Sequence, residues 1–215
     1  MQTNAQSRAL AVAVWPERIN RAVLAVLLVL AGTAILAISA KIKVPFYPVP
    51  MTLQTLAVLL IAATYGSRLA VATVVVYIAE GMLGLPVFTN TPPAIAGPAY
   101  MLGPTGGFIV SWIAVAAIVG SAADRGWDRS IPRLAAAMLV AIVVQFAIGF
   151  AWFAWFATLS PGLLELLGVP EGTRGAGASF AWAQGVAPFI LGDLLKVALA
   201  ALAVPAAWNL VDRRI

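Results

Sequence analysis

Two charged residues, Asp193 and Lys196, interrupt an apolar stretch that runs from Pro188 to Trp208, "PFILGDLLKVALAALAVPAAW". Residues three apart share one face of an α-helix, so both side chains should point the same way. A charge at the centre of a membrane helix costs about 2.5 to 3.5 kcal/mol on insertion scales, and pairing offsets only part of this cost. The pair is therefore interpreted either as a neutralised structural contact between helices or as a polar clamp for a ligand.

The hydrogen-bonding capacities of the two side chains are complementary. A carboxylate accepts hydrogen bonds and an ammonium donates them. Together they suit a small group that presents N–H donors beside a C=O acceptor. A cyclic urea has this arrangement, but so do an amide and the edge of a pyrimidine-like ring, so the pair alone does not name a substrate.

The composition predicts a membrane protein and excludes most enzyme mechanisms. The chain of 215 residues is 62% hydrophobic and only 10% charged, with a mean hydropathy of +0.98, far from the usual values for a soluble domain. It contains neither Cys nor His, which excludes thiol nucleophiles, disulfides, imidazole bases and His- or Cys-ligated metals. We expect no cofactor and no metal.

Long apolar runs predict an all-α integral membrane protein, a single membrane domain over residues 1–215 with six transmembrane helices. A membrane-crossing helix needs roughly 20 residues, so the second span is expected to be short and to continue irregularly into the loop before it. The expected spans cover approximately residues 22–40, 53–65, 69–85, 108–123, 134–159 and 186–210.

The basic residues predict the orientation of these spans. Six spans place both termini on one side, and nine of the thirteen Lys and Arg residues fall on that side, which predicts cytoplasmic termini. Lys41, Lys43 and Arg174 fall on the outer side, and Lys196 lies within a span. The short basic clusters at the ends of apolar runs do not form the interleaved basic face of a nucleic-acid-binding protein. The nine are Arg8, Arg18, Arg21, Arg68, Arg125, Arg129, Arg133, Arg213 and Arg214.

Two outer loops carry further candidate residues. "KVPFYPVPMTLQTLAVLL" places Phe46 and Tyr47 ahead of Gln54 at the head of a short helix, and is interpreted either as an interfacial turn or as part of a binding site. Thr105 lies in "GPTGG", which is either a tight entry into the fourth helix or a point where free N–H groups attract a carboxylate. No GK[ST] follows these glycines, so the chain should not bind ATP itself.

Glu80, near the outer end of the third span, is a third charge at membrane depth. It is interpreted as snorkelling to the surface, protonated, or paired with Lys41 or Lys43.

Several stretches together resemble BioY, the biotin-specific substrate-binding (S) component of energy-coupling factor (ECF) transporters. The resemblance covers nearly the whole chain and depends on "VPFYPVPMTLQTLAVLL", "GLPVF" with the following "LGPTGG", and "PFILGDLLK", in that order and spacing. It implies a six-helix ECF S-component-like bundle that captures biotin from outside, with no cofactor of its own.

The resemblance also implies roles for individual residues. Asp193 and Lys196 match the family's Asp and Lys that bind the ureido ring, and Asn90 is the nearest match to an Asn that contacts the ligand. Because the loop from Val87 to Pro104 has no basic residue, the biotin carboxylate is expected to meet Asn90, Thr105 or backbone N–H groups, or to lie near the lysines of the first outer loop. Phe46 and Tyr47 are expected in the wall of the site, and Gln54 as an additional polar contact.

Family members dock on a transmembrane T component through small residues of the first helix, and two cytoplasmic ATPase subunits supply energy. Here Thr33 and Ala37 have the required spacing, although small residues four apart also pack within a bundle. The resemblance places the protein in a bacterial or archaeal cytoplasmic membrane.

The sequence therefore predicts a biotin-capture subunit of a vitamin transporter. An S component for another vitamin, such as thiamin or riboflavin, would use the same six-helix plan. From other classes, an intramembrane hydrolase with Asp193 and Glu80 as paired carboxylates and a structural membrane scaffold are the alternatives.

Overall fold

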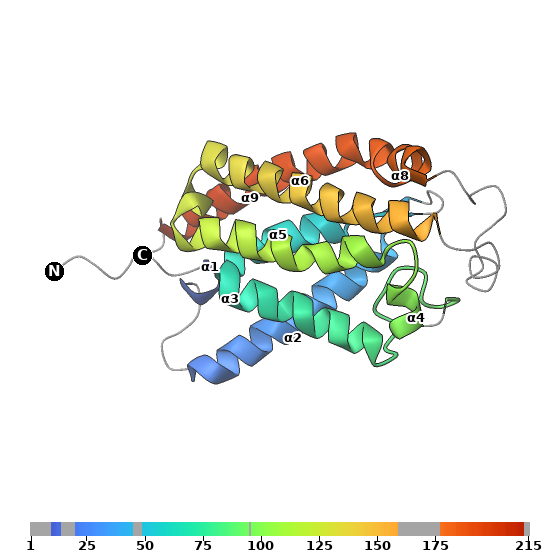
Figure 1. Ribbon diagram of the computed structural model, residues 1–215. Coiled ribbons are helices and arrows are strands. Elements are labelled where there is room, and N and C mark those ends of the chain that lie inside the picture. The colour runs from blue at the N-terminus through green and yellow to red at the C-terminus, as the bar shows by residue number, and fades with distance from the viewer. Residues whose placement is uncertain (1–9, 14–19, 45–48, 95, 159–176, 213–215) are drawn as a thin grey trace.

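The computed structural model describes residues 10–13, 20–44, 49–94, 96–158 and 177–212, and most of these are helical (Figure 1). Within them, five helical segments are long and apolar enough to cross a membrane, which confirms the prediction of an all-α membrane protein. The α-helices are α1 (Leu10–Ala13), α2 (Arg21–Lys41), α3 (Gln54–Met82), α4 (Pro98–Met101), α5 (Gly106–Asp124), α6 (Ile131–Phe156), α8 (Gly177–Gly185) and α9 (Ile190–Asp212). Two short 3-10 helices, η1 (Trp127–Arg129) and η3 (Ala187–Phe189), precede α6 and α9, and a small antiparallel pair, β1 (Lys43–Val44) and β2 (Met51–Thr52), joins α2 to α3.

Helix α3 consists of two arms that fold back on each other at Gly66. This glycine has φ 76° and ψ 171°, a conformation that is essentially restricted to glycine. In a straight helix Gln54 and Tyr77 would lie about 35 Å apart, yet Gln54 Nε2 donates to Tyr77 Oη at 2.7 Å. The arms 54–65 and 67–82 are therefore antiparallel, and the described part of the chain makes six passes through the bundle. The first arm rises only about 18 Å, which is short for a span, as the sequence predicts.

Residues of α5 hold this reversal in place. Asp124 Oδ2 accepts hydrogen bonds from the Ser67 backbone N–H at 3.1 Å and from Ser67 Oγ at 2.5 Å. Gly120 packs directly on the turn, since a Cβ at this position would lie 2.5 Å from Ser67 Cα. The carboxylate satisfies an N–H at the start of the second arm, as an N-cap does.

Helix α5 occupies the centre of the bundle, packed extensively against α3 and α6. Figure 1 shows α2 and α3 on one side of it and α6 and α9 on the other. Val115, Ala116 and Val119 on α5 are fully buried. The lipid-facing sides of α2, α6 and α9 carry exposed apolar residues such as Leu30, Val143 and Leu202, as expected for helices solvated by hydrocarbon.

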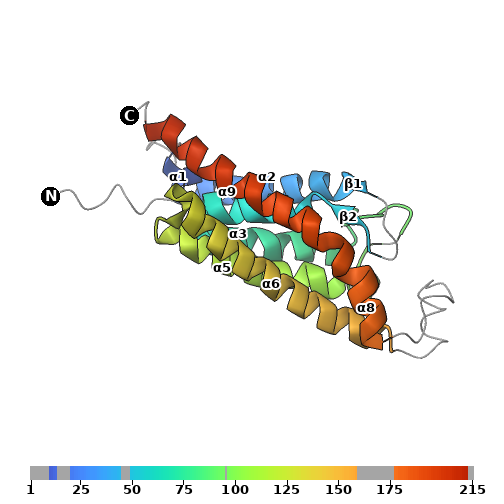
Figure 2. The same ribbon diagram turned by 90° about the horizontal axis from the view of Figure 1, so that it is seen from above.

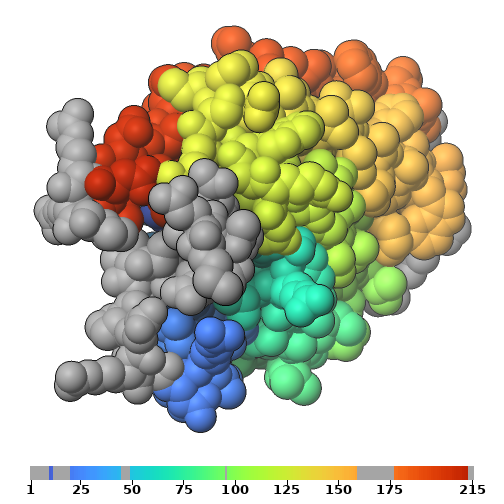
Figure 3. All heavy atoms as spheres, turned by 90° about the vertical axis from the view of Figure 1, so that its left-hand side faces the viewer, coloured from blue at the N-terminus to red at the C-terminus, as the bar shows by residue number. Residues whose placement is uncertain are grey.

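The two ends of the bundle differ in structure. One end carries β1, β2, α4 and α8 (Figures 1 and 2). At the other end the α3 reversal, the start of α6 and the end of α9 come together, as Figure 3 shows in teal, yellow and red.

The bounds of the observed helices differ from those of the expected spans by a few residues, for example in the third span and the last. The third expected span, 69–85, ends earlier, because α3 stops at Met82 and its C-cap is Leu83. The last expected span, 186–210, is replaced by η3, which contains Pro188, and by α9. Helix α8 lies in none of the expected spans. It packs against α6.

A buried carboxylate ties η1 to the end of α9. Asp128 is 2% exposed, and its Oδ2 accepts a hydrogen bond from Trp208 Nε1 at 2.5 Å. Arg129 lies over the Trp208 ring, 3.8 Å from the centroid, and its Nη1 is 2.7 Å from Asp212 Oδ2. Burial raises the pKa of the Asp128 carboxyl, although the Trp208 N–H and the Arg129 charge act in the opposite direction.

We expect Gly66→Asn to lower the free energy of unfolding by about 1–3 kcal/mol, because a side chain strains the backbone at this φ and ψ. Gly126→Asn is the matched control, since Gly126 is left-handed with φ 77° and ψ 16° and Asn tolerates that region. Thermal unfolding in detergent measures both variants. Equal losses at the two positions would contradict the special role of Gly66.

For Asp128 the raised pKa means that the folded state holds the proton more tightly than the unfolded chain does. The charged carboxyl therefore destabilises the fold above about pH 4, and the penalty fades as the pH falls through the raised pKa. We expect Asp128→Asn, which still accepts from Trp208, to melt at or above the wild-type temperature at pH 7, with the difference shrinking toward pH 4.

Asp128→Ala is the companion variant, and it should lose about 1–3 kcal/mol because it leaves the Trp208 N–H unpaired. Identical melting of the Asn and Ala variants would show that this hydrogen bond does not hold η1 to α9.

Candidate functional site

The start of α9 places Asp193 and Lys196 inside the bundle. Helix α9 begins at Ile190, after the 3-10 turn at Pro188, so Asp193 lies in its first turn, where the helix dipole favours a carboxylate. Lys196 Nζ donates to Asp193 Oδ1 at 2.7 Å. Asp193 is 2% exposed and Lys196 7% exposed. The pair is thus both buried and in direct contact.

A third side chain, Gln145 on α6, completes the surroundings of the carboxylate. Gln145 Nε2 donates to Asp193 Oδ2 at 3.3 Å. The two carboxylate oxygens therefore have different partners, an ammonium on Oδ1 and an amide on Oδ2. This arrangement fixes the orientation of the carboxylate and the amide relative to α9.

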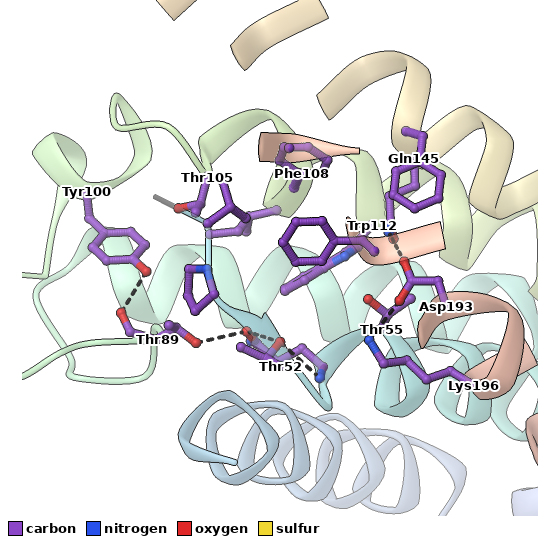
Figure 4. Close-up of a pocket in the computed structure, with 17 residues that line it drawn as sticks. Thr52, Thr55, Thr89, Tyr100, Thr105, Phe108, Trp112, Gln145, Asp193 and Lys196 are labelled. Atoms are coloured by element: carbon purple, nitrogen blue, oxygen red, sulfur yellow. Dashed lines mark hydrogen bonds and ion pairs between the residues drawn. The ribbon is translucent and has the colours of Figure 1, made fainter. Parts of the chain in front are cut away.

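These residues line a pocket between the helices, part of which is open to solvent. Figure 4 shows Trp112, Gln145, Asp193 and Lys196 at one end, and Thr89, Tyr100 and Thr105 at the other. One end is thus charged, and the other carries hydroxyl groups without a charge. The lining comprises Val49, Pro50, Thr52, Gln54, Thr55, Thr89, Tyr100, Thr105, Phe108, Ile109, Trp112, Gln145, Phe146, Gly185, Phe189, Asp193 and Lys196.

The loop between α3 and α4 forms the hydroxyl end of the pocket and is held by Lys41. Lys41 Nζ donates to the carbonyl oxygens of Pro86 at 2.8 Å, Phe88 at 2.7 Å and Thr91 at 2.5 Å. An ammonium has three N–H donors, so these carbonyls use all of them. Glu80 receives none of these hydrogen bonds, so a pair with Lys41, one of the interpretations left open for Glu80, does not form.

Polar contacts below this loop connect it to α2 and α3. Thr89 Oγ1 donates to the Ala40 carbonyl at 2.8 Å, and Tyr77 Oη donates to the Val87 carbonyl at 3.0 Å. Gln54, which donates to Tyr77, thus supports the loop and lines the pocket at the same time.

An aromatic stack anchors the same loop. Phe88 is fully buried; its ring lies 4.8 Å from that of Tyr100, stacked, and 5.5 Å from that of Tyr77, edge-on. Gly81 makes room for it, since a Cβ there would lie 2.0 Å from Phe88 Cζ. Tyr100 Oη donates to the Thr89 carbonyl at 2.6 Å, and burial raises the pKa of Tyr100 to about 12. Tyr100 therefore acts as a neutral hydrogen-bond donor at physiological pH.

The structure brings together four of the predicted site residues and separates one. Asp193, Lys196, Gln54 and Thr105 line the same pocket. Asn90 does not, because it has a positive φ of 61°, its side chain is exposed, and its Oδ1 accepts a hydrogen bond from Lys43 Nζ. Its neighbour Thr89 lines the pocket instead. The predictions for Phe46 and Tyr47 lie outside the described residues.

The predicted docking residues of α2, Thr33 and Ala37, pack against the bundle. Thr33 is 4% exposed and its Oγ1 donates to the Leu30 carbonyl. Ala37 is half-buried against the core. The adjacent Gly32 lets α3 approach, because a Cβ there would lie 2.5 Å from Thr73 Cγ2. These small residues serve helix packing within the chain.

Sequence reasoning missed Trp112 and Gln145 as lining residues. Gln145 gave a visible signal, since it is a polar residue inside the apolar run of α6. Trp112 gave none, because tryptophan is common in membrane helices.

The site offers binding groups but no catalytic pair. Glu80, the second carboxylate of the hydrolase alternative, is not in the lining, and Asp193 contacts Lys196 and Gln145. The described residues also contain no cluster of three or more His, Cys, Asp or Glu that could hold a metal.

Comparisons with known proteins agree with this interpretation. The BioY family pattern matches residues 7–213. The chain is 32% identical over 169 residues to a probable biotin transporter BioY of Pyrococcus horikoshii, covering 79% of this chain and 86% of that one. It is 30% identical over 176 residues to the biotin transporter BioY of Thermotoga maritima, covering 79% and 87%.

The fold also matches a solved structure, the S-component for biotin from an ECF-type ABC transporter. The TM-score is 0.65 at 20% identity, over 90% of this chain and 95% of that chain. The match confirms the predicted S-component-like bundle. The relatives are named as transporters, which agrees with the prediction that the chain is not an enzyme.

We expect Lys41→Met to loosen the α3–α4 loop, because three carbonyls lose a charged donor. Amide hydrogen exchange of residues 86–91 should accelerate at least about 5-fold, in line with a loss of about 1 kcal/mol or more. Lys43→Met is the matched control, since the contact of Lys43 is with the exposed Asn90 side chain. Equal exchange in both variants would contradict the role given to Lys41.

Proposed function

This chain belongs to the BioY family, and on that basis we propose that it captures biotin as the S component of an ECF-type ABC transporter. The observation that carries the proposal is the Asp193–Lys196 pair, which is buried at membrane depth and lines a pocket. A purely structural ion pair has no need of a cavity beside it. Ionisable residues that face a cavity inside a membrane protein typically mark a substrate site.

The chemistry of the pair matches the head group of biotin. The ureido ring presents two N–H donors and one C=O acceptor. Asp193 keeps lone pairs for an N–H, and Lys196 keeps two N–H donors after its bond to Asp193. Because both side chains are buried, little water competes for these hydrogen bonds, which strengthens them.

The different chemical character of the two ends of the pocket supports one orientation of the ligand. The ureido ring would lie at the charged end, and the carboxylate of the side chain would extend toward Thr105 at the hydroxyl end (Figure 4), because the hydroxyl protons of Thr89 and Tyr100 are already donated to backbone carbonyls. Phe108, Phe146 and Phe189 supply apolar contacts between the ends. Asn90 is not assigned a contact in this proposal.

We further propose that the pocket opens to the outside of a prokaryotic cytoplasmic membrane and that the chain forms a single membrane domain. Arg68, Arg125, Arg129 and Arg133 lie at or beside the α3 reversal, η1 and the start of α6, at the end opposite α4 and β1. The positive-inside rule assigns that end, and with it both termini, to the cytoplasm.

The transport cycle would need partner subunits. The sequence has no nucleotide-binding motif, so a T component and two cytoplasmic ATPases would supply the energy. Because Thr33 and Ala37 face the bundle, the T component would contact a different surface of the chain.

Calorimetric titration of the detergent-purified protein tests the proposal. We expect tight binding of one biotin per chain and no binding of thiamin or riboflavin. Heat with either of these vitamins and none with biotin would keep the S-component assignment and replace the substrate. Absence of binding to all three would overturn the proposal.

We expect Asp193→Asn to weaken biotin binding at least about 30-fold, since truncating a buried hydrogen-bonded charge costs 2 kcal/mol or more. Asp212→Asn is the matched control, because it also loses an ion pair, to Arg129, but at the opposite end of the bundle. Retention of wild-type affinity by a folded Asp193→Asn variant would remove the pair from the site.

A further inference from the structure

Two polar atoms in the pocket have no hydrogen-bond partner among the described residues. They are Trp112 Nε1, a donor, and Gln145 Oε1, an acceptor. The residues are only 5% and 3% exposed. Buried polar groups are nearly always paired, and an unpaired one calls for an explanation. Both residues line the pocket beside Asp193 (Figure 4).

The orientation of the Gln145 amide follows from its neighbour. Its NH2 group faces Asp193 Oδ2, to which it donates at 3.3 Å. The reverse orientation would place two oxygens against each other, so the hydrogen-bond network assigns Oε1 to the side away from the carboxylate. The unused acceptor is therefore a consequence of the Asp193 contact.

Trp112 has a fixed position as well. It lies on the central helix α5, and its ring packs against Tyr77 at 6.2 Å between centroids. An indole N–H can only donate. Tyr77 Oη accepts from Gln54 and donates to the Val87 carbonyl, and Trp112 Nε1 makes no hydrogen bond to it.

The free hydrogen-bonding groups at the charged end include both acceptors and donors. The acceptors are the remaining lone pairs of Asp193 and the Oε1 atom of Gln145. The donors are the two free N–H groups of Lys196 and the N–H of Trp112. A cyclic urea offers two N–H donors and a carbonyl oxygen with two lone pairs. Two acceptors and two donor residues in the site thus meet two donors and two lone pairs in the ligand.

We propose that Trp112 and Gln145 are specificity-determining residues, and that with Asp193 and Lys196 they form a four-residue site for the ureido ring. Trp112 and Lys196 donate to the ureido oxygen, and Gln145 and Asp193 accept from the two N–H groups. The inference rests on the proposed function, because it takes biotin as the ligand. It explains why two buried polar groups are unpaired in the protein alone.

The variant Trp112→Phe tests the proposal by moving two quantities in opposite directions. It removes an unpaired buried donor, so the melting temperature without ligand should stay at or above that of wild type. It also removes a ligand hydrogen bond, so the Kd for biotin should rise roughly 10-fold.

Trp208→Phe is the matched control, because Trp208 donates to Asp128 at the other end of the bundle. It should melt at a lower temperature with an unchanged Kd. If Trp112→Phe behaves like this control, Trp112 is a structural residue and the proposal is overturned.

A second measurement does not depend on the folding of a variant. In protein with ¹⁵N-labelled tryptophan, one buried indole N–H resonance should move downfield when biotin is added, as a new hydrogen bond forms. Indole resonances that all stay in place on saturation would overturn the assignment of Trp112.

Gln145→Leu completes the test. It should raise the Kd for biotin at least as much as Trp112→Phe does, since it removes an acceptor and also frees Asp193. An unchanged Kd would exclude Gln145 from the site.

Titration of the wild-type protein with biotin distinguishes failure of the further inference from failure of the proposed function. If wild type binds biotin and both variants bind equally well, the further inference fails while the proposed function stands. If wild type does not bind biotin, both fail together.

Discussion

The buried ion pair between Asp193 and Lys196 is the interaction on which the other features of the site depend. Neither charge is tolerable alone in a helix surrounded by hydrocarbon, and their mutual contact compensates only part of the desolvation. The Gln145 amide adds a hydrogen bond to the carboxylate. The remaining capacity of all three side chains is directed at the pocket, which is the arrangement expected of a preformed polar site whose ligand supplies the missing partners.

The rest of the fold keeps that site in place from two directions. The reversal at Gly66 allows the first arm of α3 to be short, so that Gln54 and Thr55 at its start reach the pocket. At the end of the bundle that carries α4, Lys41 and the Phe88 stack hold the α3–α4 loop in place. The reversal depends on a backbone conformation that is essentially restricted to glycine. The loop depends on three backbone carbonyl groups that converge on one lysine.

The sequence alone was sufficient to predict the helices and the charged pair, and insufficient for contacts that depend on packing. Apolar runs and helical spacing are local properties, so the bundle and the shared face of Asp193 and Lys196 followed from them. The position of Asn90 depends on a positive φ and on Lys43, and the inward direction of Thr33 depends on Gly32 meeting α3. The unpaired state of the Trp112 N–H becomes visible only when every neighbour is known.

The central claim is that the ureido ring binds between the charged residues of α9, and a structure of the biotin complex tests it most directly. The account predicts that the ureido group lies within hydrogen-bond distance of Asp193 and Lys196, with the carboxylate at the Thr89 and Thr105 end. Biotin bound in the reverse direction, with its carboxylate on Lys196 and its ureido ring at the hydroxyl end, would contradict it.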